Sequence, residues 1–175
     1  MIFGLYPDPD SPLNELGPYK FTDSLDIIRS EADGYSLWGN SGQALAEDIL
    51  QGQLGNCWFM HGASVVAQKP GRLEKVFHNQ ELSPNGIYAV DFYVLGVRTT
   101  VVVDDIIPLN NRGQPIFAKV SEETQALWPL ILEKAIAKVH GSYSSIETDS
   151  AAYSTHLLTG THDTQYTHAD SDATA

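Results

Sequence analysis

The segment QGQLGNCWF, Gln51 to Phe59, constrains this chain most, because it sets a glycine-punctuated loop directly before an apolar helix. Gly52 and Gly55 predict a tight loop. Beyond the loop, apolar residues recur at the spacing of one buried helical stripe, which Lys69-Pro70 ends: Phe59, Met60, Ala63, Val66 and Ala67. The chain's only cysteine, Cys57, lies at the junction of loop and helix.

Cys57 is therefore a candidate nucleophile. The positive end of the helix dipole favours a thiolate at this position, and the thiolate is the reactive form. Gln51, six residues upstream, could donate its side-chain amide to an oxyanion, with the backbone N–H of Cys57 as the second donor. The alternative is that Cys57 is a small, inert, buried hydrophobic residue, as many lone cysteines are.

At these residues the chain resembles the calpains, cysteine endopeptidases with a papain-like core. QGQLGNCWF is similar to the calpain active-site segment, and three further segments match in order: YPDPDSPLNELG from Tyr6, VVVDDIIPL from Val101, and ILEKAIAKVHGSY from Ile131. The resemblance covers roughly residues 6–166. It implies an α+β papain-like fold, here the first subdomain with a central nucleophile-bearing helix and a β-hairpin.

The resemblance also implies the chemistry. A histidine deprotonates Cys57, the thiolate attacks a peptide carbonyl, Gln51 stabilises the oxyanion, and water releases the acyl-enzyme. In calpains that histidine and an asparagine lie in a second subdomain beyond the matched stretch. We therefore expect protein substrates, a second protease subdomain as partner, and no activity from these 175 residues alone. A noncatalytic calpain-like interaction module is the alternative function.

Some residues depart from the calpain pattern. Asn56 replaces the usual aspartate before the cysteine, which removes a negative charge beside the thiolate and should do little harm. His61 stands where a small residue is usual, and SSIETDS from Ser144 replaces the usual SGG. One turn after Cys57, His61 could act as a base or, with Cys57, hold a metal, but we expect a residue one turn deeper to be buried.

Calcium is the cofactor that the resemblance implies, as a regulator that aligns the two subdomains. Asp48 matches an acidic calcium ligand ahead of the active site. The second acidic position falls at Ala126, although Glu122 and Glu123 lie just upstream, so we expect weak binding. An exposed aspartate bordering the active-site loop is the alternative for Asp48. Adjacent Asp104 and Asp105 read as structural turn residues.

Composition agrees with a cytoplasmic protein. One cysteine cannot form an internal disulfide, and no apolar run approaches the ~20 residues of a membrane span. The formal charge of -12 argues against nucleic acid and favours cations or basic proteins as partners.

The chain divides into three parts. Residues 1–45 predict an arm that packs on the core through Phe21, Leu25, Ile28, Tyr35 and Trp38. Residues 46–166 form the protease subdomain, and 167–175 a disordered tail. Within the subdomain we expect a hairpin over 86–108 that turns at Leu95-Gly96. We also expect a helix over 129–139 with a core stripe of Leu132, Ala135, Ile136 and Val139. Beyond Lys138 the polar composition predicts a stretch without a packing partner, including His156, His162 and His168.

Overall fold

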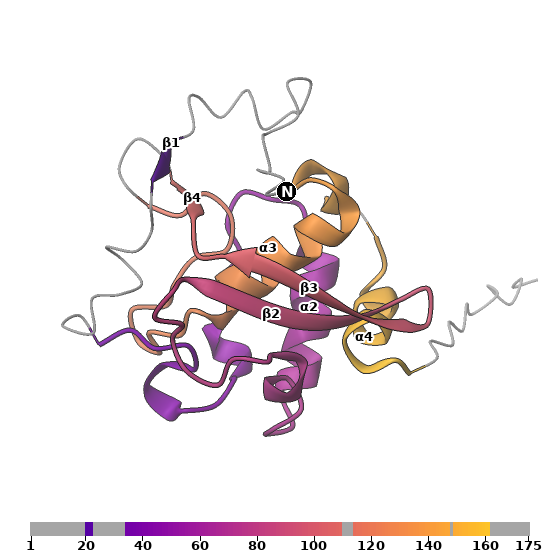
Figure 1. Ribbon diagram of the computed structural model, residues 1–175, viewed down its shortest axis with the longest axis horizontal. Helices are drawn as coiled ribbons and strands as arrows, with labels where there is room; N and C mark the ends of the chain where they lie inside the picture. The colour runs from indigo at the N-terminus through magenta and orange to yellow at the C-terminus, as the bar shows by residue number, and fades with distance from the viewer. Residues whose placement is uncertain (1–19, 23–33, 110–113, 148, 162–175) are drawn as a thin grey trace, which may run out of the picture.

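The computed structural model describes residues 20–22, 34–109, 114–147 and 149–161, which form an α+β fold (Figure 1). The helices are α2 (Cys57–Ala67), α3 (Trp128–His140) and α4 (Ala151–Thr159). Strands β2 (Ile87–Val94) and β3 (Val97–Asp104) pair with each other, and β1 (Lys20–Thr22) pairs with β4 (Ile107–Leu109), both antiparallel. The α+β fold class expected from the sequence is confirmed.

The β2–β3 hairpin forms where the alternating pattern predicts it. Its two-residue turn is Leu95-Gly96, with φ of 51° and 78° respectively, and Val94 pairs with Val97 on either side. Two consecutive positive φ angles match the right-handed twist of the strands that they connect. Tyr88, Val90 and Phe92 are buried on the inner face, so the predicted hairpin is confirmed.

From Trp128 to Ala137, helix α3 is buried on every side, which the sequence pattern did not predict. Pro129 occupies its first turn, and Gly141 follows it with φ of 96°. All residues from Trp128 to Ala137 are buried, including Glu133 and Lys134, whereas only one core-facing stripe was expected. The helix is therefore the central element of the core.

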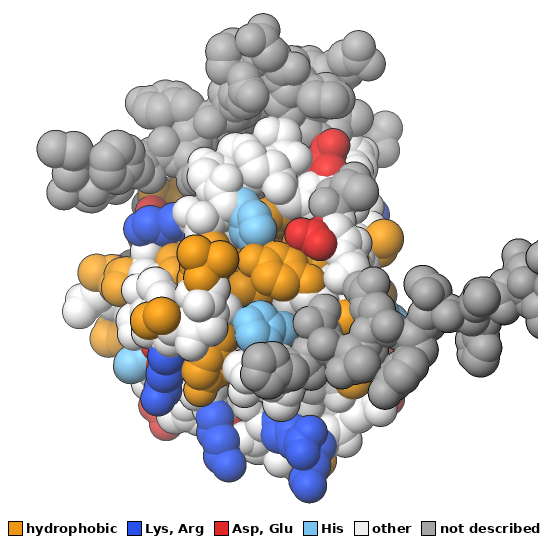
Figure 2. Space-filling model, turned by 90° about the vertical axis from the view of Figure 1, so that its right-hand side faces the viewer, with side chains coloured by type: hydrophobic (Ala, Val, Ile, Leu, Met, Phe, Trp, Pro, Cys, Tyr) orange, Lys and Arg blue, Asp and Glu red, His pale blue; other side chains and the backbone are white. Residues whose placement is uncertain are grey.

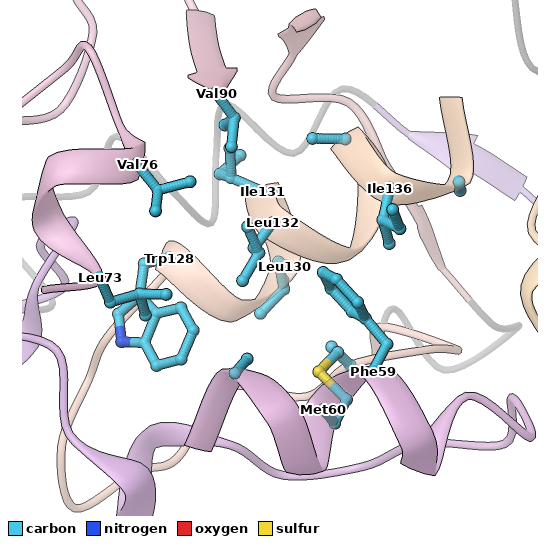
Figure 3. Packing of buried hydrophobic residues seen from close by; sticks show 14 of the residues in the cluster. Phe59, Met60, Leu73, Val76, Val90, Trp128, Leu130, Ile131, Leu132 and Ile136 are labelled. Carbon is cyan, nitrogen blue, oxygen red and sulfur yellow. The ribbon is translucent and has the colours of Figure 1, made fainter. Parts of the chain in front are cut away.

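Figure 3 shows why α3 is enclosed: it lies between α2 on one side and strand β2 of the hairpin, at Val90, on the other. Phe59 and Met60 point from α2 towards α3, and Val90 points towards α3 from β2. Phe59 and Val90 are 0% exposed and Met60 is 3% exposed. This packing fixes the direction of α2, and with it the place of its first residue.

Helix α4 corrects the expectation that nothing beyond Lys138 is packed. Ser150 caps it by accepting a hydrogen bond from Tyr153 N, and Leu157 and Leu158 are buried. It packs against α2 and β2. The approach to α2 is close: a Cβ on Gly62 would lie 1.5 Å from Ser154 Oγ.

The expected N-terminal arm is only partly described. Trp38 is buried, its indole N–H donates to Gln80 O at 2.8 Å, and its ring meets Phe77 edge-on. Tyr35 is partly buried against the core, and Phe21 belongs to β1. Leu25, Ile28, the segment from Tyr6 and the expected tail over 167–175 lie outside the described residues.

Candidate active site

Cys57 is the first residue of α2, and it is exposed. The carbonyl of Asn56 accepts the N–H groups of Phe59 and Met60, at 3.0 and 3.2 Å. By helix geometry the N–H groups of Cys57 and Trp58 come too early to find an acceptor within α2. The thiol therefore lies beside backbone donors at the positive end of a helix that is otherwise fixed in the core.

The loop before Cys57 is held against the segment 116–119. Lys119 N donates to Leu50 O at 2.8 Å, and Gln53 N donates to Ile116 O at 3.1 Å. Between these bonds, a Cβ on Gly52 would lie 1.7 Å from Phe117 O, so only glycine fits at this position. The spacing of the glycines predicted the loop, but the segment that holds it lies more than 60 residues away along the chain.

Gln51 is exposed in this loop, and its side-chain Nε2 donates to Leu54 O at 2.8 Å. An amide nitrogen carries two donors, so this bond orients the group across the loop and leaves a second N–H for another acceptor.

Asn56 turns inward from Cys57, whereas the resemblance to the calpains predicted only the loss of a charge beside the thiolate. It is 0% exposed, and its Nδ2 donates to Glu133 Oε1 at 2.7 Å. Glu133 Oε2 accepts from Ala118 N at 2.8 Å. The replacement of aspartate therefore does more than remove a charge beside Cys57: it supplies a donor to a buried glutamate.

Burial raises the pKa of Glu133 to about 7, although the hydrogen bonds from Ala118 and Asn56 act in the opposite direction. Because Glu133 bridges the residue before Cys57 and the segment that supports the loop, it connects the helix start, the loop support and α3. Burial also raises the pKa of Tyr143 well above its usual value, and the nearby charge of Glu133 adds to the effect.

Aromatic side chains close the other side of the helix start. The indole N–H of Trp58 donates to Ile146 O at 2.7 Å, and its ring stacks on Tyr153 of α4. Phe117 stacks on Tyr143 with ring centroids 4.2 Å apart. His140 meets Trp58 edge-on, and burial lowers its pKa, with the charge of Asp149 opposing the shift. The thiol of Cys57 remains exposed beside these contacts.

Asp48 is 0% exposed, so the alternative of an exposed aspartate is wrong. Its Oδ2 accepts from the indole N–H of Trp128 at 2.6 Å and from Leu45 N at 2.8 Å, across the 3-10 helix η4 (Ala46–Asp48). Its Oδ1 is buried and has no hydrogen-bond partner among the described residues. That single orphaned oxygen fits one ligand of a hard cation.

The rest of a calcium donor set is not assembled around Asp48 by acidic side chains. Ala126, at the second acidic position, is buried, whereas Glu122 and Glu123 are exposed upstream. Within the described ranges, no group of three or more His, Cys, Asp or Glu residues could hold a metal ion.

The remaining polar candidates lie apart from the chemistry. His61 is exposed, contrary to the expectation of burial. His61 and Cys57 both lie within the described residues, and no hydrogen bond joins them. His156 belongs to α4, where its Nδ1 lies 2.6 Å from Thr161 O, and not to an unpacked stretch. His162 and His168 lie outside the described residues.

Asp104 is the last residue of β3, and Asp105 follows it in the connection to β4. Asp104 Oδ1 accepts from Ile106 N at 3.0 Å and also from Lys134 Nζ. Asp105 is buried against Gly86, whose carbonyl accepts the N–H of Asp105 at 3.0 Å. These are the contacts of turn residues.

Sequence reasoning missed Glu133 and Trp128 as residues that support the site. Glu133 sits within the largely apolar run ILEKAIAK, and a charged residue in such a run was the available signal. Its partner Asn56 is 77 residues away, and the partner of Trp128, Asp48, is 80 residues away. No local spacing reveals such pairs.

None of the helices within the described residues is long and apolar enough to cross a membrane.

Comparison with known proteins places these features in a family. The sequence profile of the calpain family cysteine proteases matches residues 34–175. The chain is 41% identical over 140 residues to calpain-type cysteine protease DEK1 of Arabidopsis thaliana, which covers 80% of this chain and 6% of that protein. It is 43% identical over 107 residues to DEK1 of Zea mays, covering 61% of this chain and 5% of that protein.

A mammalian relative shows the same similarity. The chain is 37% identical over 101 residues to calpain-13 of Rattus norvegicus, covering 57% of this chain and 15% of that protein. The chain thus spans a small fraction of the curated relatives that it matches. With a family profile that covers most of its length and an α+β fold led by the cysteine-bearing helix, the chain belongs to the calpain family of cysteine proteases.

Proposed function

We propose that this chain is the nucleophile-bearing subdomain of a calcium-dependent, calpain-like cysteine endopeptidase that hydrolyses peptide bonds in protein substrates. The observation that carries the proposal is the position of Cys57: an exposed thiol on the first residue of a helix that buries seven of its 11 residues. The glycine loop before it is hydrogen-bonded to the segment 116–119. A rigid nucleophile beside preorganised donors is what acyl transfer requires.

In the proposed reaction a histidine of a second subdomain takes the proton from Cys57 Sγ. The thiolate attacks the carbonyl carbon of the scissile bond, and the developing oxyanion accepts hydrogen bonds from the Cys57 N–H and the Gln51 amide. The histidine then protonates the leaving amine, and water hydrolyses the thioester. The bond from Gln51 to Leu54 O supports this role, because it orients the amide before substrate arrives.

Calcium, in this proposal, binds away from the reacting atoms and biases the alignment of the two subdomains. Asp48 would contribute Oδ1 as one ligand, and the loss of an acidic side chain at Ala126 makes the site weak. The bonds from Asp48 to Trp128 and Leu45 support a second, structural role for the same carboxylate.

The test is peptide hydrolysis by this chain alone and by this chain joined to a calpain subdomain that supplies the histidine and asparagine. We expect turnover only in the joined protein, and none after Cys57→Ala. Gln51→Ala should lower kcat by about 10²–10³-fold, the usual loss for one oxyanion donor. Gln53→Ala, an exposed glutamine two residues along the same loop, is the matched control and should change kcat little.

Two outcomes would contradict the proposal. If the joined protein folds but does not hydrolyse peptides, the chain is better described as a noncatalytic calpain-like interaction module. If the 175-residue chain alone turns over peptides at enzyme-like rates, the base lies within it, and His61 becomes the first candidate.

A further inference from the structure

A pocket of about 710 Å³ lies away from Cys57, between the second half of α2, the β2–β3 hairpin and α4. Val65 and Val66 of α2 line it, eight and nine positions after Cys57. At 1.5 Å per helical residue, they are about 12–14 Å along the helix axis from the nucleophile. A ligand in this pocket would leave the thiol accessible.

The pocket is cationic in a chain that is strongly acidic. Arg72, Lys75 and Arg98 line it, three of the ten Lys and Arg residues in a sequence with formal charge -12. Arg72 and Lys75 are exposed, and the side chain of Arg98 is 61% exposed. Figure 2, which views the molecule from the α4 side of Figure 1, shows Lys and Arg side chains gathered along the lower edge of this face.

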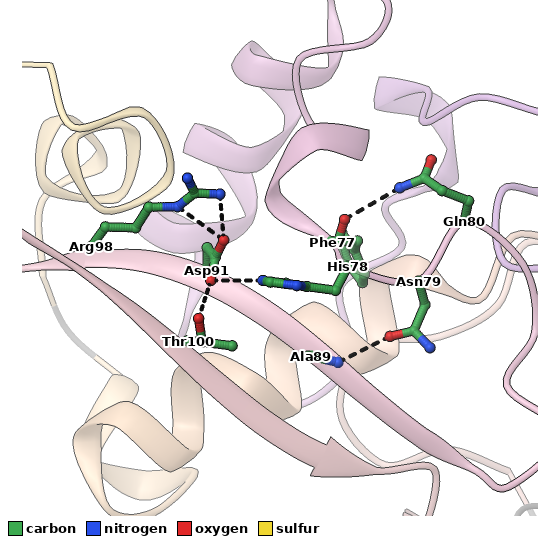
Figure 4. Close-up of polar contacts among 8 residues, drawn as sticks. All are labelled: Phe77, His78, Asn79, Gln80, Ala89, Asp91, Arg98 and Thr100. Carbon is green, nitrogen blue, oxygen red and sulfur yellow. Dashed lines mark hydrogen bonds and ion pairs between the residues drawn. The ribbon is translucent and has the colours of Figure 1, made fainter.

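Asp91 is the one acidic residue in the lining, and its contacts partly neutralise it and hold Arg98 in place. Both Nε and Nη2 of Arg98 donate to Asp91 Oδ2, at 2.9 and 2.6 Å, while Thr100 and His78 contact Oδ1 (Figure 4). Burial would raise the pKa of Asp91, but the hydrogen bonds from Thr100, His78 and Arg98 keep it below its usual value. The remaining Arg98 N–H groups stay available on an already ordered guanidinium.

The walls beside these cations are apolar or carry hydroxyl groups. Val66, Val76 and Leu158 are buried side chains that line the pocket, and Val65 is 43% exposed. Thr155 and Thr159 of α4 add hydroxyl groups. The site therefore suits a ligand with both an apolar side chain and several separated negative charges.

We propose that this pocket is a docking site for an acidic peptide segment that carries an apolar side chain. A single phosphate would fill little of the volume and would meet Asp91 beside Arg98. An anionic membrane surface is usually bound by clusters of four to eight cations, more than line this pocket. Carboxylates spaced along a peptide can instead reach Arg72, Lys75 and Arg98 separately while one apolar residue enters between α2 and α4.

The probe for the test is a short fluorescein-labelled peptide of aspartate and glutamate with one central leucine, and binding is followed by fluorescence anisotropy. The protein is the 175-residue chain carrying Cys57→Ala, so hydrolysis plays no part and failure here leaves the proposed function untouched. We expect saturable binding that weakens with rising salt. Replacing the leucine of the probe by glycine, or its acidic residues by lysine, should abolish binding.

Matched variants locate the site. Lys75→Glu should weaken binding about tenfold, whereas Lys119→Glu, an exposed lysine outside the pocket with the same charge change, should change it less than twofold. Val65→Asp, at a partly exposed wall position, should also weaken binding about tenfold without unfolding the protein, as checked by thermal melting.

Three results would overturn the proposal: equal weakening by Lys75→Glu and Lys119→Glu, which indicates a general charge effect; competition by inorganic phosphate at the affinity of the peptide; or capture of the protein by anionic lipid vesicles without binding of the peptide.

Discussion

At the scale of single residues, the hydrogen bond from Asn56 to Glu133 links the residue before Cys57 to the buried helix α3. A protonated Glu133 is neutral and can still accept hydrogen bonds from Asn56 Nδ2 and Ala118 N. An ionised Glu133 instead keeps a charge in a site that is 3% exposed. The folded protein therefore favours the protonated form.

This preference sets a pH dependence of stability. The pKa of Glu133 is about 7 in the folded protein and 4.5 as the ordinary value, so the folded state binds more protons between these values. The free energy of unfolding should therefore fall as pH rises from about 4.5 to about 7, by roughly 3 kcal/mol from this group. In Glu133→Gln, urea unfolding between pH 5 and 8 should show a flatter profile. Glu122→Gln, at an exposed position, is the control; equal profiles in the two variants would contradict the assignment.

Asp48 combines an acceptor for Trp128 and Leu45 with one orphaned oxygen, so a substitution that keeps the acceptor separates its two roles. Asp48→Asn retains an oxygen for those donors but removes the charge. We expect calorimetric titration to give a calcium Kd of ~10⁻⁴ to 10⁻³ M for the parent chain. Binding should be lost in Asp48→Asn and kept in Glu47→Gln, the exposed neighbour with the same charge change. Micromolar binding, or binding indifferent to Asp48, would show that the site is misassigned.

At the scale of secondary-structure elements, α2 and α4 meet through a glycine. A Cβ on Gly62 would lie 1.5 Å from Ser154 Oγ and 2.6 Å from Ser154 Cβ. Glycine-to-alanine changes inside helices normally stabilise a protein by about 1 kcal/mol. Gly62→Ala should instead destabilise it, by about 1–3 kcal/mol, because α4 must move away. Thermal melting shows whether Gly62→Ala stabilises or destabilises the protein. If the clash is the cause of destabilisation, adding Ser154→Gly should restore most of the lost stability.

In the hairpin turn, by contrast, a substitution should stabilise the protein. Leu95 has φ of 51° and is 92% exposed, so its side chain contributes little packing while its backbone adopts a conformation that costs leucine energy. Leu95→Asn gives the Asn-Gly pair that this turn favours and should stabilise the protein by about 0.5–1 kcal/mol. Leu95→Val, with a β-branched side chain, should lower the melting temperature. A lower melting temperature for Leu95→Asn would contradict this account of the turn.

At the scale of the whole molecule, the sequence best predicts the features that depend on the local spacing of apolar residues and on glycine and proline. The hairpin, the loop before Cys57, and the start and end of α2 and α3 all follow from spacing, glycine and proline. Helix α4 could not be predicted this way, because its sequence AAYSTHLLT is largely small and polar. Its packing depends on a surface that Gly62 creates far away in the chain.

The same limit applies to the candidate site. Cys57 and Gln51 could be proposed from one short segment, since they lie six positions apart. The support beneath them is not, because Asn56 pairs with Glu133 and Asp48 with Trp128 only after the chain has folded. A resemblance to the calpains supplied the second half of the mechanism, which no residue pattern of this chain specifies.

The burial of α3 on every side from Trp128 to Ala137 has a consequence for how this sequence can vary. A helix with one buried stripe rejects substitutions at every third or fourth position and accepts them elsewhere, so a record of tolerated changes reveals its period. From Trp128 to Ala137 there is no solvent-facing side on which variation can accumulate. Tolerance to substitution along this stretch should be uniformly low and should not follow the helical period. The helix at the centre of the core would therefore be the hardest element to recognise as a helix from its tolerated variants.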